Sequence, residues 1–557
     1  MDKTTTSTEG AARDRRDQLI RALRRKKATR PGRDGVGGTT GGPIPLGGAV
    51  RDGDLVPSFG QERLWFLDRL DPGRATYNMP LAIRIVGTLE VNAMASAVRA
   101  VVERHESLRT AYADVRGRLV QRVIPGPADC FEAISQTGGI ERAEADAFQA
   151  AMRAAWQPFD LTRGPLLRVR LYEVGLNQHL LLLVAHHIAA DGWSIGLIAH
   201  DLETAYLQAA AGSEPSLPAP RLQYADFAAW QRSTADETRL SEDVAWWRAR
   251  LAGLDPLELP TDHPRPAVAR GRGASLPIRI GPEIARPLEI LARECRATIF
   301  MALFAAFADL LSRYAGKTDI ALGTPLAGRD HRATETVVGL FVNTVVLRLD
   351  VAGRPSFGTL LGRAREVVVD AFEHRAVPFE RLVEELRPER DSSRAPLVQV
   401  MLAFQNTPGA VPTFGARRAE RIELPQTTTK LDLSLVLEPA DDGGIEGILE
   451  YDRALFEPAT LRGMLDHFVQ LLAQVSSSPD QPAADLDLLG LDERETLHLF
   501  ATGDDRWRAV DDVVTTFHAQ ACADASQPAV ITGRRAITYG ELRRRVNRLT
   551  AQLRELR

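Results

Sequence analysis

Two adjacent histidines end an apolar run in the stretch LLLVAHHIAADGWS, residues 181–194, and an Asp-Gly pair follows four residues later. Neighbouring side chains on a strand point to opposite faces, so we expect His186 and His187 to diverge, one toward a core and one toward a cleft. A histidine in a cleft can accept or donate a proton near neutral pH. Asp191 in the following turn would accept hydrogen bonds or pair with an arginine, and Gly192 would let the backbone pass close to whatever fills the cleft.

A lone histidine pair has two other interpretations, a core pair without a chemical role and a metal site. It is most often a hydrogen-bonded pair in a core, without a chemical role. A metal site needs more ligands, but adjacent strand histidines diverge and no third ligand lies at a familiar spacing. The three cysteines, Cys130, Cys295 and Cys522, are isolated and show no metal-ligand spacing. We therefore expect no metal here.

Composition excludes several classes of function. The chain has 557 residues, of which 44% are hydrophobic and 25% charged, and its net charge is −4. That charge gives no general electrostatic reason to bind nucleic acid. Isolated cysteines favour a reducing, cytoplasmic location over a disulfide framework. No apolar run approaches the roughly 20 residues of a membrane span, and the first residues do not form a secretory signal.

The elements around the motif alternate between strands and helices. We expect a strand over 79–91, a helix over 92–109, a pair of strands over 164–174 and 179–187, and a helix over 194–210 with Ser194 as its N-cap. A second region of similar pattern begins near Tyr224. This mixed order predicts two α+β lobes, each a sheet backed by helices.

The two ends of the chain differ from its middle. Residues 11–28 predict a short basic helix, which is either a frayed terminus or a docking element for another chain, and residues 30–48 form a Gly-rich linker. Residues 476–487 indicate a domain edge. Residues 528–557 read as strand, turn, strand and helix, with a T-x-x-E capping box at Thr538. We expect this last segment to be the truncated start of another domain.

The pattern His-His-x-x-x-Asp-Gly is similar to the signature of the chloramphenicol acetyltransferase-like acyltransferases, and HHIAADGWS resembles the condensation domains of nonribosomal peptide synthetases. Further blocks resemble that family in the right order. They are SFGQERLWFLDRL (58–70), RHESLRTAY (104–112), YADFAAWQR (224–232), GLFVNTVVLR (339–348), HRAVPFERLVEEL (374–386) and SRAPLVQVMLAFQN (393–406). The resemblance covers about residues 54–490, and AITYGELRRRVNRLTAQLR near the end is similar to the first motif of an adenylation domain.

The resemblance implies a fold and a division of the chain. The fold would be two chloramphenicol acetyltransferase-like lobes in a V-shaped pseudo-dimer, with the active site at the lobe junction and a tunnel from each face. The expected parts are the basic helix and linker (1–53), the N-lobe (54–225), the C-lobe (226–490), a linker (491–512) and the start of an adenylation domain (513–557).

The resemblance also implies a reaction. The family joins an upstream acyl or peptidyl thioester to the amine of a downstream aminoacyl thioester, with both substrates on phosphopantetheine arms of carrier proteins and no cofactor bound directly. The α-amino group titrates near 7.7–8.0, so the enzyme must align the ends and keep the amine neutral. We expect His187 to face the tunnel junction, as general base or as a group that orients the amine.

The other motif residues are expected to shape the site. By resemblance, His186 and Asp191 are structural, and Asp191 pairs with an arginine of the other lobe, for which Arg329 is the first candidate. A pantetheine arm or substrate would pass Gly192. Two arginines and a tryptophan complete the set: Arg104 and Arg109 are expected to brace the turn near His187, and Trp193 is either a core aromatic or a tunnel wall.

Three related functions share part of this pattern. An epimerisation domain has the histidine pair, but the opening block and the adenylation-like segment argue against it. A soluble acyltransferase using coenzyme A would not run into an adenylation domain. A degenerate recruitment domain would bind partner enzymes without catalysis, and the intact His187 and Gly192 argue against it. The opening block favours an L-configured donor, and the absence of a preceding carrier domain predicts that the donor carrier is on a separate subunit, while the acceptor carrier lies downstream.

Overall fold

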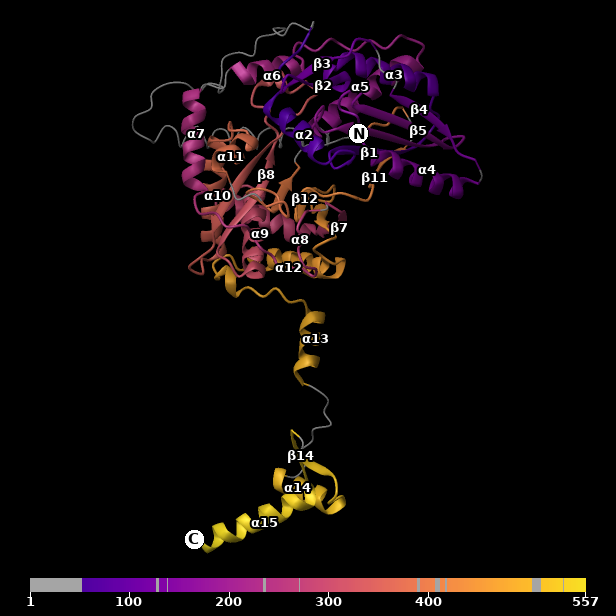
Figure 1. The fold of residues 1–557 in the computed structure, drawn as a ribbon. Helices are drawn as coiled ribbons and strands as arrows, with labels where there is room; N and C mark the ends of the chain where they lie inside the picture. Colours follow the sequence, from indigo (N-terminus) through magenta and orange to yellow (C-terminus); the bar gives the residue numbers. More distant parts are fainter. Residues whose placement is uncertain are drawn as a thin grey trace. The chain divides into compact units, whose positions relative to one another are not determined.

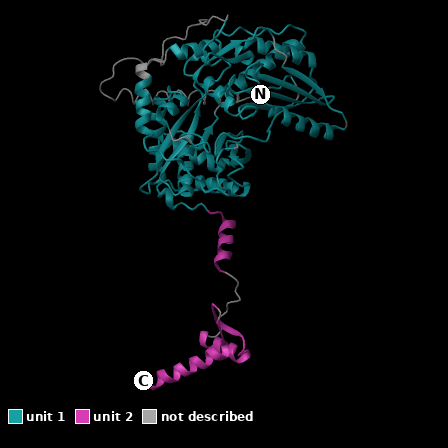
Figure 2. Cartoon of the chain, in the orientation of Figure 1, with its two compact units in different colours: residues 1–488 teal, residues 489–557 magenta. Residues whose placement is uncertain are grey.

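The computed structural model describes residues 53–126, 130–137, 139–233, 237–269, 271–387, 391–405, 411–415, 418–502, 512–533 and 535–556. The chain forms two compact units, residues 1–488 and 489–557 (Figure 2). The basic helix and Gly-rich linker predicted before residue 53 lie outside the described residues.

The first lobe of unit 1 is built on a five-stranded sheet that carries the histidine motif (Figure 1). Its strands lie in the order β11 (Arg418–Ile422), β1 (Asn78–Val86), β6 (Gln178–His186), β5 (Leu167–Gly175) and β4 (Phe131–Ser135). As predicted, β5 and β6 pair, in antiparallel register. A short helix, α2 (Phe59–Leu70), precedes β1, and a separate hairpin is formed by β2 (Thr110–Val115) and β3 (Arg118–Val123).

Helices cover both faces of this sheet, which explains the apolar run before the histidines. Leu181 and Leu183 of β6 pack in one core with α3 (Val91–Arg104) and α5 (Gly192–Ala210). Leu182 alternates with them and packs on the other side against the alanine-rich face of α4 (Ile140–Ala155). A central strand that is covered on both faces is apolar at every position rather than at alternate ones.

The second lobe has a six-stranded mixed sheet backed by its own helices. The strand order is β7 (Gly273–Ile280), β13 (Ile445–Asp452), β12 (Leu433–Pro439), β10 (Val400–Phe404), β8 (Asp319–Leu326) and β9 (Asn343–Asp350). The helices that share its core are α7 (Glu237–Arg250), α8 (Pro282–Glu294), α9 (Ile299–Ala315), α10 (Phe357–Glu373), α11 (Phe379–Leu386) and α12 (Pro458–Ser477). The prediction of two α+β lobes, each a sheet backed by helices, is confirmed.

The chain does not divide between the lobes at residues 225 and 226, as the sequence predicted. Helix α6 (Tyr224–Ser233) places Tyr224 and Phe227 in the core of the first lobe, whereas Trp247 of α7 lies in the core of the second. Later, β11 leaves the second lobe and pairs antiparallel with β1. The connection 423–432 then returns to β12. The reason is that β1 offers an unpaired edge, and an added strand satisfies its hydrogen bonds.

Two further boundaries differ from the prediction. The helix expected over 92–109 ends at Arg104, and a 3₁₀ turn over Glu106–Arg109 follows it. The predicted linker 491–512 contains helix α13 (Leu491–Thr502), none of whose residues is buried. An exposed helix with so weak an apolar stripe gives little signal in the sequence.

Unit 2 holds the strand, turn, strand and helix predicted at its end. These are β14 (Pro528–Thr532), β15 (Arg535–Thr538) and α15 (Tyr539–Glu555), preceded by α14 (Val513–Ala523). Thr538 caps α15 by accepting a hydrogen bond from the backbone of Glu541 at 3.3 Å. Val546, Leu549 and Leu553 of α15 are exposed.

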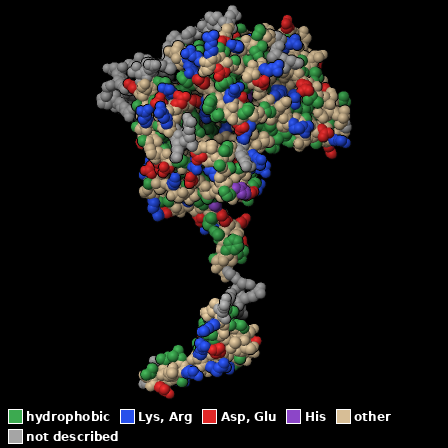
Figure 3. Space-filling view, viewed as in Figure 1, with side chains coloured by type: hydrophobic (Ala, Val, Ile, Leu, Met, Phe, Trp, Pro, Cys, Tyr) green, Lys and Arg blue, Asp and Glu red, His purple; other side chains and the backbone are tan. Residues whose placement is uncertain are grey.

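The surface of unit 1 is mixed in charge. Figure 3 shows basic and acidic side chains interspersed over the visible face, in keeping with the net charge of −4. Within the described residues, no single helix has both the length and the apolar character to cross a membrane. Helices α8 and α9, which are bent by 105° at their junction, meet the length and composition criteria only when they are taken together.

Candidate active site at the lobe junction

Backbone hydrogen bonds fix both histidines where β6 ends. The backbone N–H of His186 donates to the carbonyl of Leu166 at 3.0 Å, and that of His187 donates to the carbonyl of Tyr77 at 2.8 Å. Strands on both sides of β6 therefore hold the turn that follows it. The two imidazoles diverge, as strand alternation predicts.

His186 occupies the position of a core residue. Only 3% of its surface is exposed, and its ring lies edge-on to Phe159 with centroids 6.0 Å apart. The backbone N–H of Ile188 donates to its Nδ1 at 3.2 Å, so that nitrogen is unprotonated. Burial lowers its pKa to about 3, so the imidazole is neutral at physiological pH. This geometry agrees with the structural role that the sequence predicts.

His187 is half-buried and presents one nitrogen for chemistry. Its Nδ1 lies 2.9 Å from the carbonyl oxygen of Ala190. Because a carbonyl only accepts, Nδ1 carries the proton, and Nε2 has the free lone pair. Burial, assisted by the positive charge of Lys430, lowers the pKa of His187, while Ala190 and Asp191 oppose that shift. The ring is therefore a neutral acceptor at physiological pH.

The Asp191 carboxylate links the two lobes, and both of its oxygens bind protein groups. Its Oδ1 lies 3.0 Å from Nη2 of Arg329, and both side chains are 4% exposed. The backbone N–H of Phe341 donates to Oδ2 at 3.0 Å. Arg329 also donates to the carbonyls of Thr334 and Val337. Burial lowers the pKa of Arg329, and Asp191 opposes that shift. The predicted ion pair between the lobes is present.

Asp191, and not Ser194, is the N-cap of α5. Its carboxylate accepts from the backbone N–H of Ser194 at 2.8 Å and from the Ser194 hydroxyl at 2.7 Å. The same hydroxyl accepts from Nη2 of Arg329 at 2.8 Å and from the backbone N–H of Gly339 at 3.1 Å. Aspartate is one of the preferred N-cap residues, and the carboxylate of Asp191 fills that role. The sequence prediction of the cap was wrong by three residues.

Gly192 and Trp193 begin α5 on the side of the junction. Gly192 is exposed, and a Cβ built on it would meet no atom within 4 Å. The fold itself thus does not require a glycine here, and the open space is available to a ligand. Trp193 is half-buried, and its indole N–H donates to the carbonyl of Glu335 in the other lobe at 2.9 Å. It is neither a fully buried core aromatic nor a freely exposed side chain.

Arg104 and Arg109 do not brace the turn near His187. Nε of Arg104 lies 3.1 Å from Oδ2 of Asp201, and Arg109 donates to the carbonyl of Ile124 at 2.7 Å. Both arginines lie at the end of α3 and in the 3₁₀ turn after it, so their side chains tie those segments to neighbouring parts of the first lobe. In the described residues the side-chain hydrogen bonds and ion pairs of these two arginines are with Glu103, Ile124, Asp201 and Pro218 and not with residues 186–192, so this prediction was wrong.

Lys430, which sequence reasoning missed, lies in the connection between β11 and β12. Its Nζ is 4.7 Å from the centroid of the Tyr77 ring, and its side chain is exposed. Desolvation nevertheless lowers its pKa to about 8, against the opposing charge of Glu450. One signal was present in the sequence: the chain has only five lysines among 69 basic residues.

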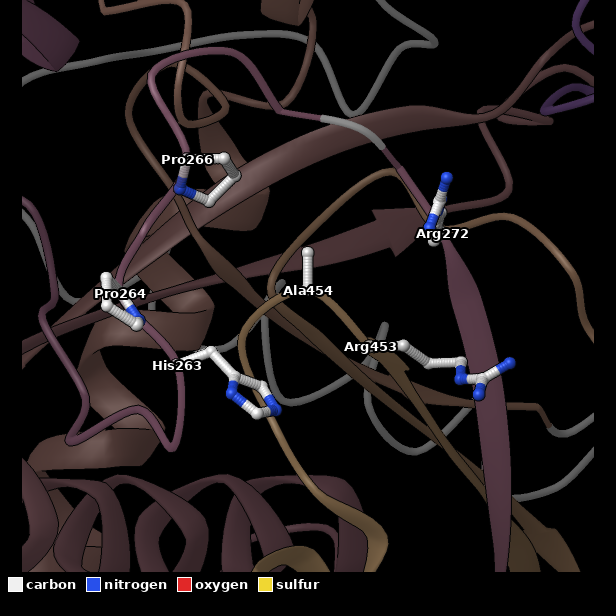
Figure 4. A pocket seen from close by; sticks show the side chains of 6 residues that line it. All are labelled: His263, Pro264, Pro266, Arg272, Arg453 and Ala454. Carbon is white, nitrogen blue, oxygen red and sulfur yellow. The ribbon is translucent and has the colours of Figure 1, made fainter.

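A pocket of about 420 Å³ lies elsewhere in the second lobe. Its lining residues are His263, Pro264, Pro266, Arg272, Arg453 and Ala454 (Figure 4). The two guanidinium groups point in different directions, and Nε2 of His263 is already 2.7 Å from Glu457. These side chains do not converge on one point, so the lobe junction is the better candidate for chemistry.

The lobe junction thus combines a buried ion pair between two α+β lobes with a neutral histidine. Residues 53–498 match the family "Condensation domain". The chain is 40% identical over 526 residues to one of the subunits of linear gramicidin synthase from Brevibacillus parabrevis, covering 92% of this chain and 7% of that protein. It is 36% identical over 532 residues to the dimodular nonribosomal peptide synthase of Bacillus subtilis (strain 168), covering 91% and 22%.

Solved structures share the fold of this chain. The X-domain in its complex with OxyB from teicoplanin biosynthesis matches with a TM-score of 0.74 at 29% identity, covering 82% of this chain and 100% of that one. A four-domain nonribosomal peptide synthetase bound to AMP and glycine shares the fold, with a TM-score of 0.77 at 23% identity over 91% of this chain and 39% of that one.

The chain belongs to the condensation domain family of nonribosomal peptide synthetases. Domains of this family form amide bonds in an acyltransferase-type reaction, and this chain falls in that class of enzyme. It spans less than a quarter of the length of the two curated relatives described above.

Proposed function

We propose that unit 1 joins an acyl or peptidyl thioester on an upstream carrier protein to the α-amine of an aminoacyl thioester on a downstream carrier. The observation that supports this most directly is the free Nε2 of a neutral His187 at the lobe junction. The amine nitrogen attacks the thioester carbonyl, the C–N bond forms and the C–S bond breaks. The proton lost by the amine ends on the departing thiol of the donor arm.

His187 has one task in this scheme, which is to accept a hydrogen bond or the proton from the attacking amine at Nε2. Asp191 and Arg329 hold the two lobes in the register that places His187 between the donor and the acceptor. The phosphopantetheine arms belong to the carriers, so the domain needs no cofactor of its own. The open space beside Gly192 is a suitable path for one arm.

The finer assignments follow from the resemblance of the sequence blocks. We infer that the donor residue has the L configuration, since the block at residues 58–70 resembles that subclass. We also infer that unit 2 is the beginning of an adenylation domain, which supplies the acceptor amino acid to the downstream carrier. A cytoplasmic location fits substrates that are made and loaded there.

The decisive experiment loads donor and acceptor groups on carrier proteins and detects the dipeptidyl product by mass spectrometry. We expect the product with the wild-type chain and a loss of roughly 10²–10⁴-fold in rate with His187→Ala, because proton transfer in the transition state contributes about that much. His200→Ala, on an exposed position of α5, is the matched control and should keep full activity.

A recruitment function is the second candidate, because an X-domain in complex with OxyB is among the structural neighbours. The two functions separate in the same assay. A chain that yields no product with any loaded carrier, yet binds a partner enzyme with unchanged affinity after His187→Ala, would favour recruitment. A product that depends on His187 favours condensation.

A further inference from the structure

We propose that Lys430 is a positioning residue for the condensation reaction, whose ammonium group, held against the Tyr77 ring, places a positive charge at the lobe junction that disfavours protonation of the His187 imidazole and of the incoming amine. The inference rests on the proposed function and deepens it. The charge acts through His187 and the substrate amine, without bonding to either.

The backbone on both sides of Lys430 is anchored to the second lobe. The N–H of Thr429 donates to the carbonyl of Gly271 at 3.1 Å, and the N–H of Asp432 donates to the carbonyl of Gln399 at 3.0 Å. A Cβ on Gly271 would lie only 3.1 Å from the carbonyl oxygen of Thr429, so the two segments are in close contact. The backbone position of Lys430 is therefore fixed relative to the second lobe.

The side chain of Lys430 reaches across to the first lobe. Its Nζ lies 4.7 Å from the centroid of the Tyr77 ring, within the range of a cation–π interaction. The carbonyl of this same Tyr77 accepts the backbone hydrogen bond of His187 at 2.8 Å. The residue that holds the ammonium group therefore also holds the turn that carries the imidazole.

The charges around this junction leave Lys430 as the main positive influence on His187. Asp191 acts in the opposite direction, but its carboxylate is paired with Arg329. His186 is neutral and buried. Lys430 and Asp191 are thus the charged side chains that act on the titration of His187. Burial raises the pKa of the Tyr77 phenol, which stays neutral.

The surroundings of Lys430 itself leave its charge available. Glu450 of β13 is the acidic group that acts on it, and Arg63 is the other cation. Nη1 of Arg63 lies 3.0 Å from Glu380, so this cation is paired. No carboxylate of the described residues lies within ion-pair distance of Nζ of Lys430, and the Glu450 side chain is half-buried on its own strand.

This arrangement matches what the attacking amine needs. An α-amino group titrates near 7.7–8.0 when free, and only its neutral form attacks a thioester. A neighbouring cation disfavours the ammonium form by like-charge repulsion. Desolvation lowers the pKa of Lys430 to about 8, so its charge is present in the pH range where the amine would otherwise be protonated. Above that range the amine is neutral without help.

The test compares Lys430→Gln with the wild-type full chain by two measurements. The first is NMR titration of ¹³C-labelled histidine, with the His187 signal assigned by its loss in His187→Ala. The second is the rate of dipeptidyl product formation from pH 6 to 9. We expect the pKa of His187 to rise by roughly half a unit to one unit in Lys430→Gln. We expect the rate to fall roughly threefold to tenfold at pH 6.5 and to recover toward pH 9.

Two further variants sharpen the comparison. Lys430→Arg keeps the charge and should keep the wild-type titration at neutral pH. Lys317→Gln removes a lysine whose Nζ donates to Pro256 elsewhere in the second lobe, and should change neither measurement.

An unchanged His187 titration in folded Lys430→Gln overturns the proposal. A rate that falls equally at every pH, without a change in that titration, also overturns it and indicates direct stabilisation of the tetrahedral intermediate. The NMR measurement needs no substrate, so it still decides the electrostatic role of Lys430 if the proposed function fails and no product forms.

Discussion

At the scale of single residues, the two imidazoles of the site differ in the hydrogen-bond partner of Nδ1. In His186 this nitrogen accepts from the backbone, and in His187 it faces a carbonyl and must donate. The same strand end therefore yields one histidine that completes a core and one with Nε2 free for a substrate. Neither ring needs a charge at physiological pH, because burial lowers both pKa values.

The depressed pKa of His186 predicts a dependence of stability on pH. Its folded pKa of about 3 lies below the unfolded value of about 6.5, so between these values the unfolded chain binds more protons. Stability must then fall as the pH drops from 6.5, by up to about 1.4 kcal/mol per pH unit from this group. Urea unfolding of wild type and His186→Gln between pH 5 and 6.5 measures the difference in slope, which should be smaller in the variant. Parallel slopes would show that His186 is not the group responsible.

Gly192 supports a prediction that separates folding from function. Because a Cβ there meets no protein atom, Gly192→Ala should leave the free energy of unfolding unchanged or slightly raised. Activity should nevertheless fall roughly tenfold or more if a substrate arm passes this point, since a displacement of about 1 Å has large effects on rate. The matched control is Gly196→Ala, which is also exposed and open in the same helix. Equal activity of the two variants would place the arm elsewhere.

Individual residues were predictable where a local motif determines them. The divergence of His186 and His187 follows from strand alternation, and the ion pair of Asp191 with Arg329 followed from family resemblance. Lys430 was not predictable in this way. Its place at the junction depends on a strand exchange between lobes, which no local pattern around TTTKLDL contains.

At the scale of elements, one carboxylate at the start of α5 has two structural roles. Asp191 caps the helix that follows the histidines and also receives Arg329 from the second lobe. The carboxylate that caps the helix is therefore the same one that joins the helix to the second lobe. The 3₁₀ turn after α3 and the crossover strand β11 were not predicted from the sequence. Tertiary contacts determine where these two elements form, and the hydrophobic periodicity of the sequence does not.

Asp191→Asn tests this element directly. The amide can still accept from the backbone of Ser194, but Arg329 loses its carboxylate and stays buried, so we expect a destabilisation of about 3–5 kcal/mol. Activity should fall together with the melting temperature. In the double variant Asp191→Asn, Arg329→Met the buried charge is gone, and the loss should be smaller than the sum of the single losses. Strict additivity in denaturant unfolding would rule out the coupling.

At the scale of the whole chain, the two units differ in how much buried core they contain. Unit 1 contains the two large cores and the cross-lobe strand β11. Unit 2 is small, and its longest helix exposes Val546, Leu549 and Leu553. The sequence predicted both units because their motifs are separate, although it mistook α13 for linker. The division of residues between the lobes was less predictable, since β11 returns to the first lobe late in the chain.

The last prediction follows from this independence. A chain that ends at Leu488 should unfold with the same midpoint and the same cooperativity as unit 1 in the full chain, because its cores and its lobe junction lie before that residue. It should also form product from separately supplied carriers at the wild-type rate, and it should aggregate less on heating, since the exposed apolar face of α15 is absent. Calorimetry and the carrier assay measure these outcomes. A markedly lower midpoint would mean that unit 2 stabilises unit 1, and the two units could then no longer be treated as independent.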